Sequence, residues 1–391
     1  MRRMTQAPPG PLSGVHVVDV TTQLSGPYCT WLLAALGADV VKVERPEGDA
    51  ARAVGPFIGD ESLYFSSINR AKRSVVLDLR SEEGAAHLAA LIRASDVLVE
   101  NLRPGALARL GFTAERIAEL NPRLVFASIS GFGQDGPLSP RPAYDVIVQA
   151  MSGLMSITGP EGGEPVRVGV SIGDIAAGLF AAVDIVANLF ARDRDGDGGV
   201  ARVDISMLDC QLALMENAIA RCLNTEQVPG PLGTRHPSSA PFQAFPTSDG
   251  TIAIAVGNDA TWARMCRAIG RDELADDERF AGSMPRLVNH AALEAVLVAH
   301  LRTRSTSAWL EALGAADVPC GPVNSLPEAL ASDQVAARRM IVDTPGWDGA
   351  PRRFVAAPVG GRDGGHSPAP RLGEHTAEVL DELVAAERDR A

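Results

Sequence analysis

Short apolar runs alternate with amphipathic stretches along the first 130 residues of the chain. Runs rich in β-branched residues predict buried strands, whereas apolar residues spaced three or four positions apart predict helices. The expected strands cover residues 15–20, 38–44, 74–79, 96–100 and 124–128, and the expected helices cover residues 27–36, 82–94 and 114–120. This alternation predicts an α/β fold with a mostly parallel, Rossmann-like sheet and helices on both of its faces.

The pattern becomes mainly helical between Tyr144 and Cys222, with one expected strand at residues 201–205. A Pro- and Gly-rich segment at residues 229–233 has the composition of a linker. Strands are then expected at 242–245 and 251–256, and helices at 261–269, 291–302 and 307–313. We therefore expect a large α/β domain over 1–200, completed by 331–391, a smaller α+β domain over 226–314, and linkers over 201–225 and 315–330.

The composition is that of a folded globular protein, because 46% of the 391 residues are hydrophobic and 21% are charged. The formal net charge of −12 argues against a basic surface for nucleic acid or anionic lipid. The five cysteines form no CxxC pair or zinc-spaced cluster, so we expect no metal and a reducing, cytoplasmic location. The N-terminus lacks the apolar run of a signal peptide, and the most apolar stretch, residues 175–191, is shorter than a membrane span.

Two sequence patterns resemble cofactor or metal sites but fit them poorly. A βαβ unit whose second strand ends at Glu44 is typical of dinucleotide-binding proteins, yet the turn after the first strand has only Gly26 in place of GxGxxG. Residues 193–204 partly match a calcium loop, but the final glutamate is missing and the residues that follow are strand-like. We therefore expect neither a nicotinamide cofactor nor calcium, and interpret residues 193–198 as a solvated turn.

Asp174 stands at the start of a long apolar stretch that predicts a helix. The simpler interpretation is an N-cap, because aspartate is among the residues preferred there. The same position also suits a nucleophile, since the helix dipole and free amides hold a carboxylate ionised and can stabilise an oxyanion. Gly173 would then allow a thioester carbonyl to approach closely. The sequence pattern alone leaves both interpretations open.

Basic residues flank several expected strands of the first domain. They are Arg45, Lys72, Arg73, Arg80, Arg103 and Arg109. Ligands bind at the carboxyl edge of an open α/β sheet, so a group of cations there suits an anionic ligand such as a nucleotide phosphate. Each cation taken alone is equally well explained as a solvated surface charge.

Eight short segments between about residue 12 and residue 380 carry a family resemblance. They are Gly37–Arg45 (GADVVKVER), Asn69–Ser74 (NRAKRS), Val99–Gly105 (VENLRPG), Tyr144–Asp145, Gly173–Asp174, Val203–Ser206 (VDIS), Pro319–Val323 (PCGPV) and Leu372–Thr376 (LGEHT). Together they resemble the family III CoA transferases, a group that includes formyl-CoA transferase and carnitine CoA transferase. The α-methylacyl-CoA racemases are structural relatives of that group. Any one segment would be weak evidence, but jointly they are specific.

The resemblance implies a CoA transferase in which Asp174 is the nucleophile. It also implies that coenzyme A, bound as the substrate acyl-CoA, lies along Arg45, Leu77, Arg80, Asn101, Leu102 and Arg109. This set overlaps the cations named above. Members of the family form dimers in which each chain threads through the other, so we expect an interlocked homodimer. The expected partners are an acyl-CoA and a carboxylic acid, rather than nucleic acid or a membrane.

In the implied reaction Asp174 attacks an acyl-CoA to form a mixed anhydride. CoA thiolate then gives an aspartyl-CoA thioester, which an acceptor carboxylate opens. Racemases of the superfamily have a histidine where this chain has Tyr144, and a neutral phenol is a poor proton carrier. Transfer is therefore favoured over racemisation, and Tyr144 is interpreted as a hydrogen-bond donor to a substrate oxygen. A catalytically silent CoA-binding homologue is the remaining alternative.

The acid that accepts CoA is not defined by any residue pattern. Formyl-CoA transferases have a glycine-rich loop in the small domain, and the corresponding residues 255–259 contain no glycine run. This difference argues against oxalate or formyl specificity and leaves a larger or more apolar acid as the alternative.

Overall fold

The computed structural model describes residues 10–195, 199–360 and 367–390. The chain forms two compact units. Unit 1 consists of Met1–Leu154, Arg167–Glu226 and Asp333–Ala391, and unit 2 consists of Met155–Val166 and Gln227–Ser332. Unit 1 therefore contains both ends of the described chain, and unit 2 is inserted into it.

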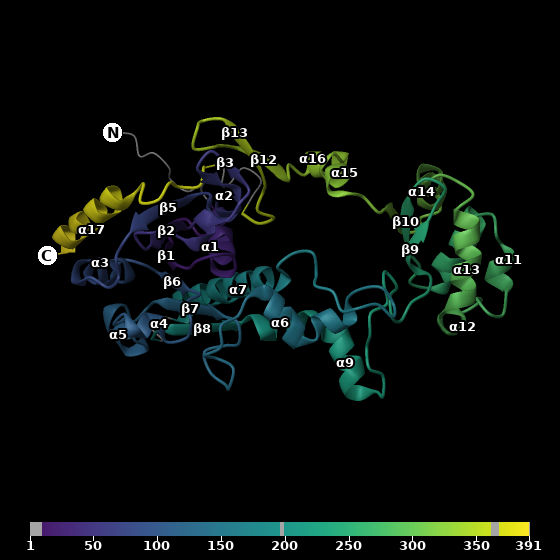
Figure 1. The fold of residues 1–391 in the computed structure, drawn as a ribbon, viewed down its shortest axis with the longest axis horizontal. Coiled ribbons are helices and arrows are strands. Elements are labelled where there is room, and N and C mark those ends of the chain that lie inside the picture. Colours follow the sequence, from purple (N-terminus) through teal and green to yellow (C-terminus); the bar gives the residue numbers. More distant parts are fainter. Residues whose placement is uncertain (1–9, 196–198, 361–366, 391) are drawn as a thin grey trace. The chain divides into compact units, whose positions relative to one another are not determined.

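Unit 1 is built on a six-stranded sheet with the order β5-β2-β1-β6-β7-β8 (Figure 1). Its strands are β1 (His16–Val20), β2 (Asp39–Glu44), β5 (Lys72–Val76), β6 (Val97–Glu100), β7 (Val125–Ser130) and β8 (Ala201–Ser206). All neighbouring strands are parallel, and Val17 of β1, for example, lies opposite Val40 and Val97. The predicted parallel α/β sheet is confirmed.

The strand expected at residues 201–205 is confirmed, whereas the linker expected over residues 201–225 is wrong. Residues 201–206 form β8, which pairs with β7 along its whole length, from Ala201 opposite Val125 to Ser206 opposite Ser130. Two helices follow it within the same unit, α8 (Met207–Leu214) and α9 (Glu216–Asn224).

Helices cover both faces of the sheet. They are α1 (Ser25–Ala35) and α7 (Ile172–Asp195) on one face, and α3 (Glu82–Arg93), α5 (Ala114–Leu120) and α17 (Thr376–Arg390) on the other. Val17 belongs to the core beneath α1 and α7, whereas its neighbour Val18 belongs to the core beneath α3, α5 and α17. Burial on both faces explains why these strands are continuous apolar runs.

Helix α7 is long and apolar enough to cross a membrane by length and composition alone, although we expected residues 175–191 to fall short of a span. In this fold α7 packs against α1, β7 and β8. Ala177, Ala181 and Ile185 are completely buried on this side of the helix. Packing in the core of unit 1 therefore accounts for the apolar character of this side.

The remaining elements of unit 1 are short. They are the 3₁₀ helix η1 (Ala50–Ala53), the strands β3 (Phe57–Ile58), β4 (Glu61–Ser62), β12 (Ile341–Pro345) and β13 (Pro351–Val355), and the helices α2 (Leu63–Asn69), α4 (Ala106–Arg109), α6 (Asp145–Ser152) and α16 (Asp333–Ala337). A further 3₁₀ helix, η2 (Leu154–Ile157), spans the boundary with unit 2. β12 and β13 form an antiparallel pair, as do β3 and β4.

Unit 2 contains an antiparallel sheet of three strands with the order β11-β10-β9. Its elements are β9 (Phe242–Pro246), β10 (Thr251–Ala255), α10 (Asp259–Ala268), α11 (Glu273–Asp276), α12 (Ser283–Val288), α13 (His290–Leu301), α14 (Thr306–Ala315), β11 (Cys320–Pro322) and α15 (Leu326–Leu330). Trp262 and Trp309 are buried in its core. Because β11 pairs with β10, residues 320–322 are part of this sheet, and the expected linker over 315–330 is wrong there.

The N-terminus of α1 approaches α7 closely at Gly178. A Cβ atom at Gly178 would lie 2.6 Å from the backbone oxygen of Ser25 and 3.2 Å from the backbone nitrogen of Cys29. Only glycine allows two backbones to come so near. This contact holds the loop after β1 beside the first turns of α7.

Candidate active site

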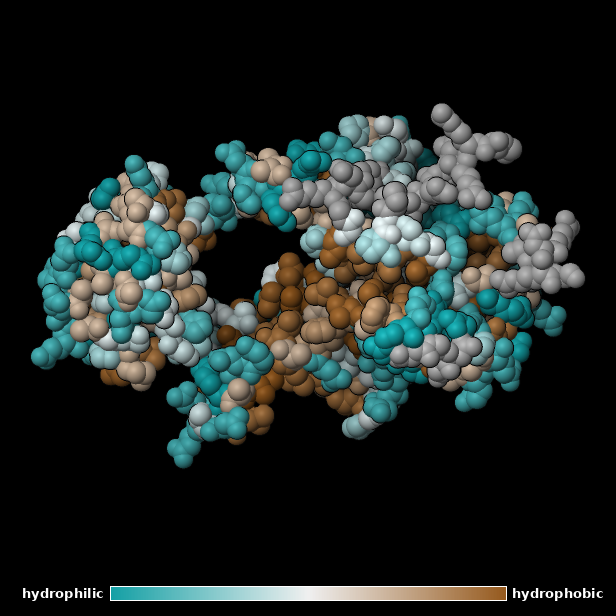
Figure 2. All heavy atoms as spheres, turned by 180° about the vertical axis from the view of Figure 1, so that it is seen from behind, coloured by the Kyte–Doolittle hydropathy of each residue, from teal (hydrophilic) through white to brown (hydrophobic). Residues whose placement is uncertain are grey.

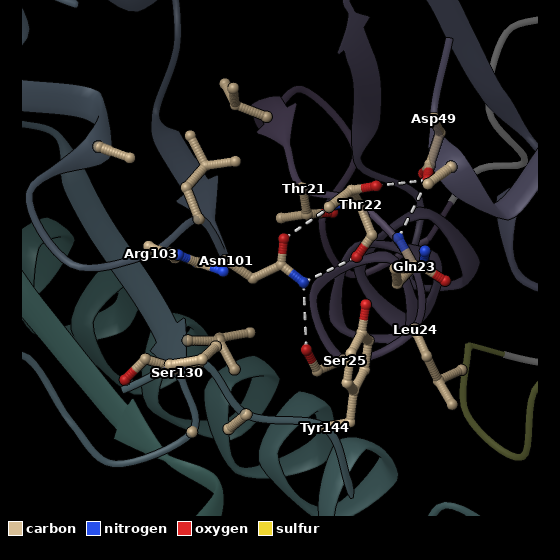
Figure 3. Close-up of a pocket in the computed structure, with 18 of the residues that line it drawn as sticks. Thr21, Thr22, Gln23, Leu24, Ser25, Asp49, Asn101, Arg103, Ser130 and Tyr144 are labelled. Carbon is tan, nitrogen blue, oxygen red and sulfur yellow. Dashed lines mark hydrogen bonds between the residues drawn. The ribbon is translucent and has the colours of Figure 1, made fainter. Parts of the chain in front are cut away.

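A cavity of about 1250 Å³ opens at the carboxyl edge of the sheet in unit 1. Residues that end or follow the parallel strands line it, among them Val20, Glu44, Leu77, Asn101 and Ser130. Figure 3 shows side chains from the loop after β1, from the loop after β6 and from the end of β7 around this space. The position is the usual one for a ligand site in an open α/β sheet.

Asp174 lines this cavity. Helix α7 begins at Ile172, so Asp174 is the third residue of the first turn. The interpretation of Asp174 as an N-cap is therefore wrong, because the helix starts three residues earlier than expected. A carboxylate in the first turn still lies at the positive end of the helix dipole.

The pKa of Asp174 is raised to about 7, from an ordinary value of 3.8. Burial is the largest cause because it removes water from the charged form, and the nearby carboxylate of Asp145 is the second. A hydrogen bond from the Ser25 side chain acts in the opposite direction and favours the carboxylate. Strongly shifted carboxyl groups in cavities are typical of functional sites.

Asp145 fixes the start of α7. Its Oδ1 accepts a hydrogen bond of 2.8 Å from the backbone nitrogen of Gly173, and its Oδ2 accepts one of 2.7 Å from Gln149 Nε2. A Cβ atom at Gly173 would lie 2.2 Å from Gln211 Nε2 and 3.0 Å from Asp145 Oδ1. Gly173 is buried, and its Cα faces these protein groups. The glycine is thus needed for packing, which is a different role from the substrate approach expected at this position.

Five of the six residues expected to hold CoA line the cavity. They are Arg45, Leu77, Arg80, Asn101 and Leu102. The sixth, Arg109, ends the short helix α4 and is not among the described residues that line it. Asn101 uses its amide inside the protein, where Oδ1 accepts from the nitrogen of Thr22 and Nδ2 donates to the oxygen of Thr22 and to Ser25 Oγ (Figure 3).

The cation group predicted at the carboxyl edge is only partly correct. Arg45, Arg80 and Arg103 line the cavity. Lys72 instead lies buried at the start of β5, with its Nζ 3.1 Å from Asp19 Oδ2, and Arg73 pairs with Asp39 at 2.6 Å. Both residues lie at the beginning of β5, and their side chains form structural ion pairs.

Tyr144 immediately precedes α6 and lines the cavity with 72% of its surface exposed. Sequence reasoning missed several other lining residues, including Ser25, Tyr64, Ser139, Arg141 and Arg167. Burial and then the charge of Asp174 raise the pKa of Tyr64, which places this phenol near the nucleophile candidate. Apart from Arg167, which lies seven positions before Asp174, these residues are far from Asp174 in the sequence, so no local pattern signals their proximity.

A buried ionic network lies beneath the loop after β1. Lys42 Nζ is 2.9 Å from Asp49 Oδ2, and both side chains are almost completely buried. Asp49 Oδ1 in turn accepts hydrogen bonds from Thr22 Oγ1 and from the nitrogen of Gln23. Gln23 has a φ of 67°, a left-handed conformation that is unusual outside glycine. The network therefore holds a strained loop against the cavity.

Within the described residues, no group of three or more His, Cys, Asp or Glu side chains has the arrangement of a metal site. The segment interpreted as a solvated turn includes residues 196–198, which lie outside the described ranges. Glu44, the acidic residue that ends β2, binds Arg52 through both carboxylate oxygens at 2.7 Å. Its carboxylate is thus committed to a partner within the protein.

The profile of CoA-transferase family III matches residues 12–376. The acetyl-CoA:oxalate CoA-transferase of Acetobacter aceti is 43% identical to this chain, and the succinate–glutarate CoA-transferase of Agrobacterium fabrum is 39% identical. Each alignment covers 97% of this chain and 97% of the relative. The protein therefore belongs to CoA-transferase family III and is an enzyme of that class.

Solved structures agree with this assignment. A CaiB/BaiF family protein from Brucella suis superimposes with a TM-score of 0.83 at 36% identity, covering 96% of this chain and 99% of that one. Rv3272 from Mycobacterium tuberculosis superimposes with a TM-score of 0.84 at 30% identity, covering 95% and 100%. The protein is thus a family III CoA transferase, and enzymes of this class use CoA thioesters as substrates.

Proposed function

We propose that this enzyme transfers CoA between an acyl-CoA and a carboxylic acid through covalent intermediates on Asp174. One observation carries this proposal: Asp174 is a largely buried carboxyl group with a pKa of about 7, in the first turn of α7 and in contact with a cavity of about 1250 Å³. A carboxylate with a raised pKa is more basic, and hence a better nucleophile, than an ordinary aspartate.

In the first step, one carboxylate oxygen of Asp174 attacks the thioester carbon of the donor. The carbon–sulfur bond breaks, and CoA leaves as the thiolate with the electron pair. In the second step the thiolate attacks the Asp174 carbonyl carbon and expels the acyl group as a carboxylate, leaving an aspartyl-CoA thioester. The acceptor carboxylate then repeats these steps in reverse order, so the thioester energy is conserved.

Arg45, Arg80 and Arg103 are suited to the phosphates of CoA, because guanidinium groups bind phosphate oxygens in pairs. All three line the same cavity as Asp174. Leu77 and Leu102 supply apolar surface at the same edge of the sheet. Together these residues would bind the CoA part of the substrate, and the thioester of that substrate would reach the start of α7.

We propose short dicarboxylic acids as the acceptors. The relatives are named for oxalate and for succinate and glutarate. Arg167 lines the cavity with about half of its side chain exposed, and its Nη2 lies 3.9 Å from Asp145 Oδ2. Because the carboxylate of Asp145 lies at this longer distance, the Arg167 guanidinium is suited to bind the second carboxylate of such an acid. The missing glycine run at residues 255–259 argues against oxalate, whereas the name of one relative favours it, so the experiments below use both oxalate and a longer acid.

We also propose a homodimer, with the interlocked form taken from the family resemblance. Figure 2 shows a continuous apolar area on unit 1. Helices α6, α7 and α8 pack against one another and expose large apolar side chains. They include Val146, Ile147, Met151, Leu179, Phe180, Val183, Phe190, Leu212 and Leu214. An apolar surface of this kind on a folded unit is typical of a permanent protein interface.

Mass spectrometry of the intact enzyme tests the proposed chemistry. We expect that acetyl-CoA or succinyl-CoA, added without an acceptor, gives a covalent adduct on the peptide that contains Asp174. Adding oxalate or glutarate is then expected to discharge the adduct and to form the corresponding new thioester. The Asp174→Asn variant is expected to give neither adduct nor product.

Asp209→Asn is the matched control, because Asp209 is the third residue of α8, as Asp174 is of α7, and is exposed. This control is expected to keep the adduct and the activity of the wild type. Deuterium entering the α-carbon of a 2-methylacyl-CoA without an acceptor would support racemisation instead. Binding of CoA with neither result would support a catalytically silent protein.

A further inference from the structure

Ser25 connects the loop after β1 to the carboxyl group of Asp174. Its hydroxyl lies close enough to the Asp174 side chain to lower the pKa of that carboxyl group, and its Oγ lies 3.2 Å from Asn101 Nδ2. Only 5% of the residue is exposed, and it lines the same cavity as Asp174. Figure 3 shows Ser25 and Asn101 joined by this contact.

The direction of these hydrogen bonds is fixed by the backbone. Asn101 Oδ1 must be the acceptor at Thr22, because a backbone nitrogen can only donate, and this contact is 2.8 Å. Asn101 Nδ2 then donates to the oxygen of Thr22, also at 2.8 Å, and to Ser25 Oγ. Ser25 therefore accepts from Asn101, which leaves its single proton available to the Asp174 carboxyl group.

The loop that carries Ser25 is held rigidly before any substrate binds. Asp49 Oδ1 accepts from Thr22 Oγ1 and from the nitrogen of Gln23, and Asp49 Oδ2 pairs with buried Lys42. Gly178 brings the backbone of Ser25 against α7. A donor fixed in this way needs no reorganisation when charge develops near it, which is the condition for strong electrostatic catalysis.

We propose that the Ser25 hydroxyl is the hydrogen-bond donor that stabilises the oxyanion formed on Asp174 itself. This assignment rests on the proposed function, because it requires Asp174 to become acylated. The Asp174 oxygen bonded to Ser25 is the one that does not attack the donor. The other oxygen becomes the bridge of the mixed anhydride.

The step that uses Ser25 is the attack of CoA thiolate on the Asp174 carbonyl carbon. A carbon–sulfur bond forms, and the carbonyl electron pair moves onto the oxygen that Ser25 contacts. The oxyanion then collapses, the bond from this carbon to the bridging oxygen breaks, and the acyl group leaves as a carboxylate that takes the bridging oxygen. No proton is transferred overall, so Ser25 acts by donating a hydrogen bond throughout. The same oxygen carries the charge when an acceptor carboxylate attacks the aspartyl-CoA thioester.

The test compares Ser25→Ala with Ser25→Thr in the full-length enzyme, using acetyl-CoA with oxalate and succinyl-CoA with glutarate. We expect Ser25→Ala to lower kcat about 100-fold, the usual effect of removing one oxyanion donor, with the KM for acyl-CoA changed less than threefold. In quenched samples the acyl-Asp174 anhydride should accumulate relative to the aspartyl-CoA thioester. The pH at which activity is half-maximal should also rise, because Ser25 favours the carboxylate form. Ser25→Thr keeps the hydroxyl and should restore most of kcat.

Asn101→Asp provides a second route if Ser25→Ala does not fold. It keeps the size of the side chain but removes both N–H donors, so Ser25 can turn its proton to residue 101, and the same loss of kcat is expected. A Ser25→Ala enzyme with kcat within threefold of the wild type and an unchanged pH profile would overturn the assignment. A wild-type enzyme that forms no adduct on Asp174 would refute the proposed function instead, so the two failures are distinguishable.

Discussion

The backbone nitrogen of Gly173 donates a hydrogen bond of 2.8 Å to Oδ1 of Asp145, which lies 28 positions earlier in the chain. This bond links the first turn of α7 to the first turn of α6, and the Gln211 side chain of α8 lies against Gly173 at the same place. The three helices thus meet in one corner at Gly173. Gly173, which precedes the proposed nucleophile, is therefore held from two other helices. The direction of the Asp174 side chain depends on this corner.

Gly173→Ala is expected to disturb this corner. The added Cβ would meet Gln211 Nε2 at 2.2 Å and Asp145 Oδ1 at 3.0 Å, so the start of α7 must move. We expect a loss of about 1–3 kcal/mol in the free energy of unfolding, the usual effect of overpacking. We also expect kcat to fall about 100-fold, because a shift of about 1 Å at a reacting group has that effect.

Gly169→Ala is the matched control for this variant. Gly169 lies four residues earlier, and a Cβ atom added to it would have no other group within 4 Å. The unfolding transition of this control in urea and its kcat are expected to match those of the wild type. Equal effects of the two substitutions would refute a specific role for Gly173.

The sequence predicted the framework of this site better than its details. Apolar runs predicted all six strands of this sheet, because both faces of a parallel sheet are buried. The strand expected at residues 201–205 is β8, but the domain division placed it in a linker, because its pairing partner, β7, lies far away in the sequence. The side chains of Lys72 and Arg73 were placed at the wrong edge, because a basic residue before a strand looks the same whether it binds a ligand or a buried carboxylate.

Asp174 illustrates the same limit. Its position before an apolar stretch suggested both a cap and a nucleophile, and the structure places it inside the first turn. The partners that set its chemistry, Ser25 and Asp145, come from two other helices. Only the folded chain brings these groups together, so no pattern of spacing around Asp174 could have identified them.

The pKa of Asp174 predicts the pH dependence of the reaction. The proposed nucleophile must be deprotonated to attack, so kcat/KM is expected to rise with pH and level off above about 7. Burial also raises the pKa of Glu100 to about 7. Glu100, however, lies at the end of β6, where its carboxylate accepts a hydrogen bond from the backbone nitrogen of Leu102, so we assign it no part in the reaction. The Glu100→Gln variant should therefore keep the acidic limb of the pH–rate profile. Loss of this limb in Glu100→Gln would assign the titration to Glu100 instead.

The same pKa shift predicts that ionised Asp174 lowers the free energy of unfolding. Between about pH 4 and pH 7 the folded state holds a proton that the unfolded state has released, so wild-type stability falls as pH rises through this window. Asp174→Asn removes the titration. At pH 8 the variant is expected to be more stable than the wild type, on the order of 2–4 kcal/mol, with the difference shrinking towards pH 4.

Chemical denaturation at pH 8 and pH 4 measures this difference. Asp209→Asn is expected to change stability by less than about 1 kcal/mol and in the opposite direction, because Asp209 is exposed and interacts favourably with the dipole of α8. A destabilised Asp174→Asn protein at pH 8 would contradict the raised pKa.

Arg167→Gln tests the proposed recognition of dicarboxylic acids. With acetyl-CoA as the donor, only the acceptor carries a second carboxylate, so the KM for oxalate or glutarate is expected to rise at least tenfold, while the KM for acetyl-CoA stays nearly constant. The loss corresponds to one charge-assisted hydrogen-bonded pair. Arg167→Lys keeps the charge and should recover part of the affinity. Equal rises in both KM values would point to a general distortion of the cavity.

The exposed apolar side chains of α7 predict the oligomeric state. Val183 is 60% exposed on this helix, whereas Ala181 and Ile185 are completely buried. Light scattering is expected to give twice the chain mass of 41.0 kDa for the wild type. Val183→Asp places a charge in the proposed interface and is expected to give monomers or to lower the Tm by several degrees.

Val384→Asp is the control, because Val384 is 48% exposed on α17, whose packing belongs to the other face of the sheet. This variant should remain dimeric. The interlocked form makes a further prediction, since threaded chains cannot separate without unfolding. Tagged and untagged wild-type enzymes, mixed in native buffer, should therefore exchange no subunits, whereas mixing before refolding should give hybrid dimers. Rapid exchange in native buffer would contradict interlocking while leaving the dimer itself intact.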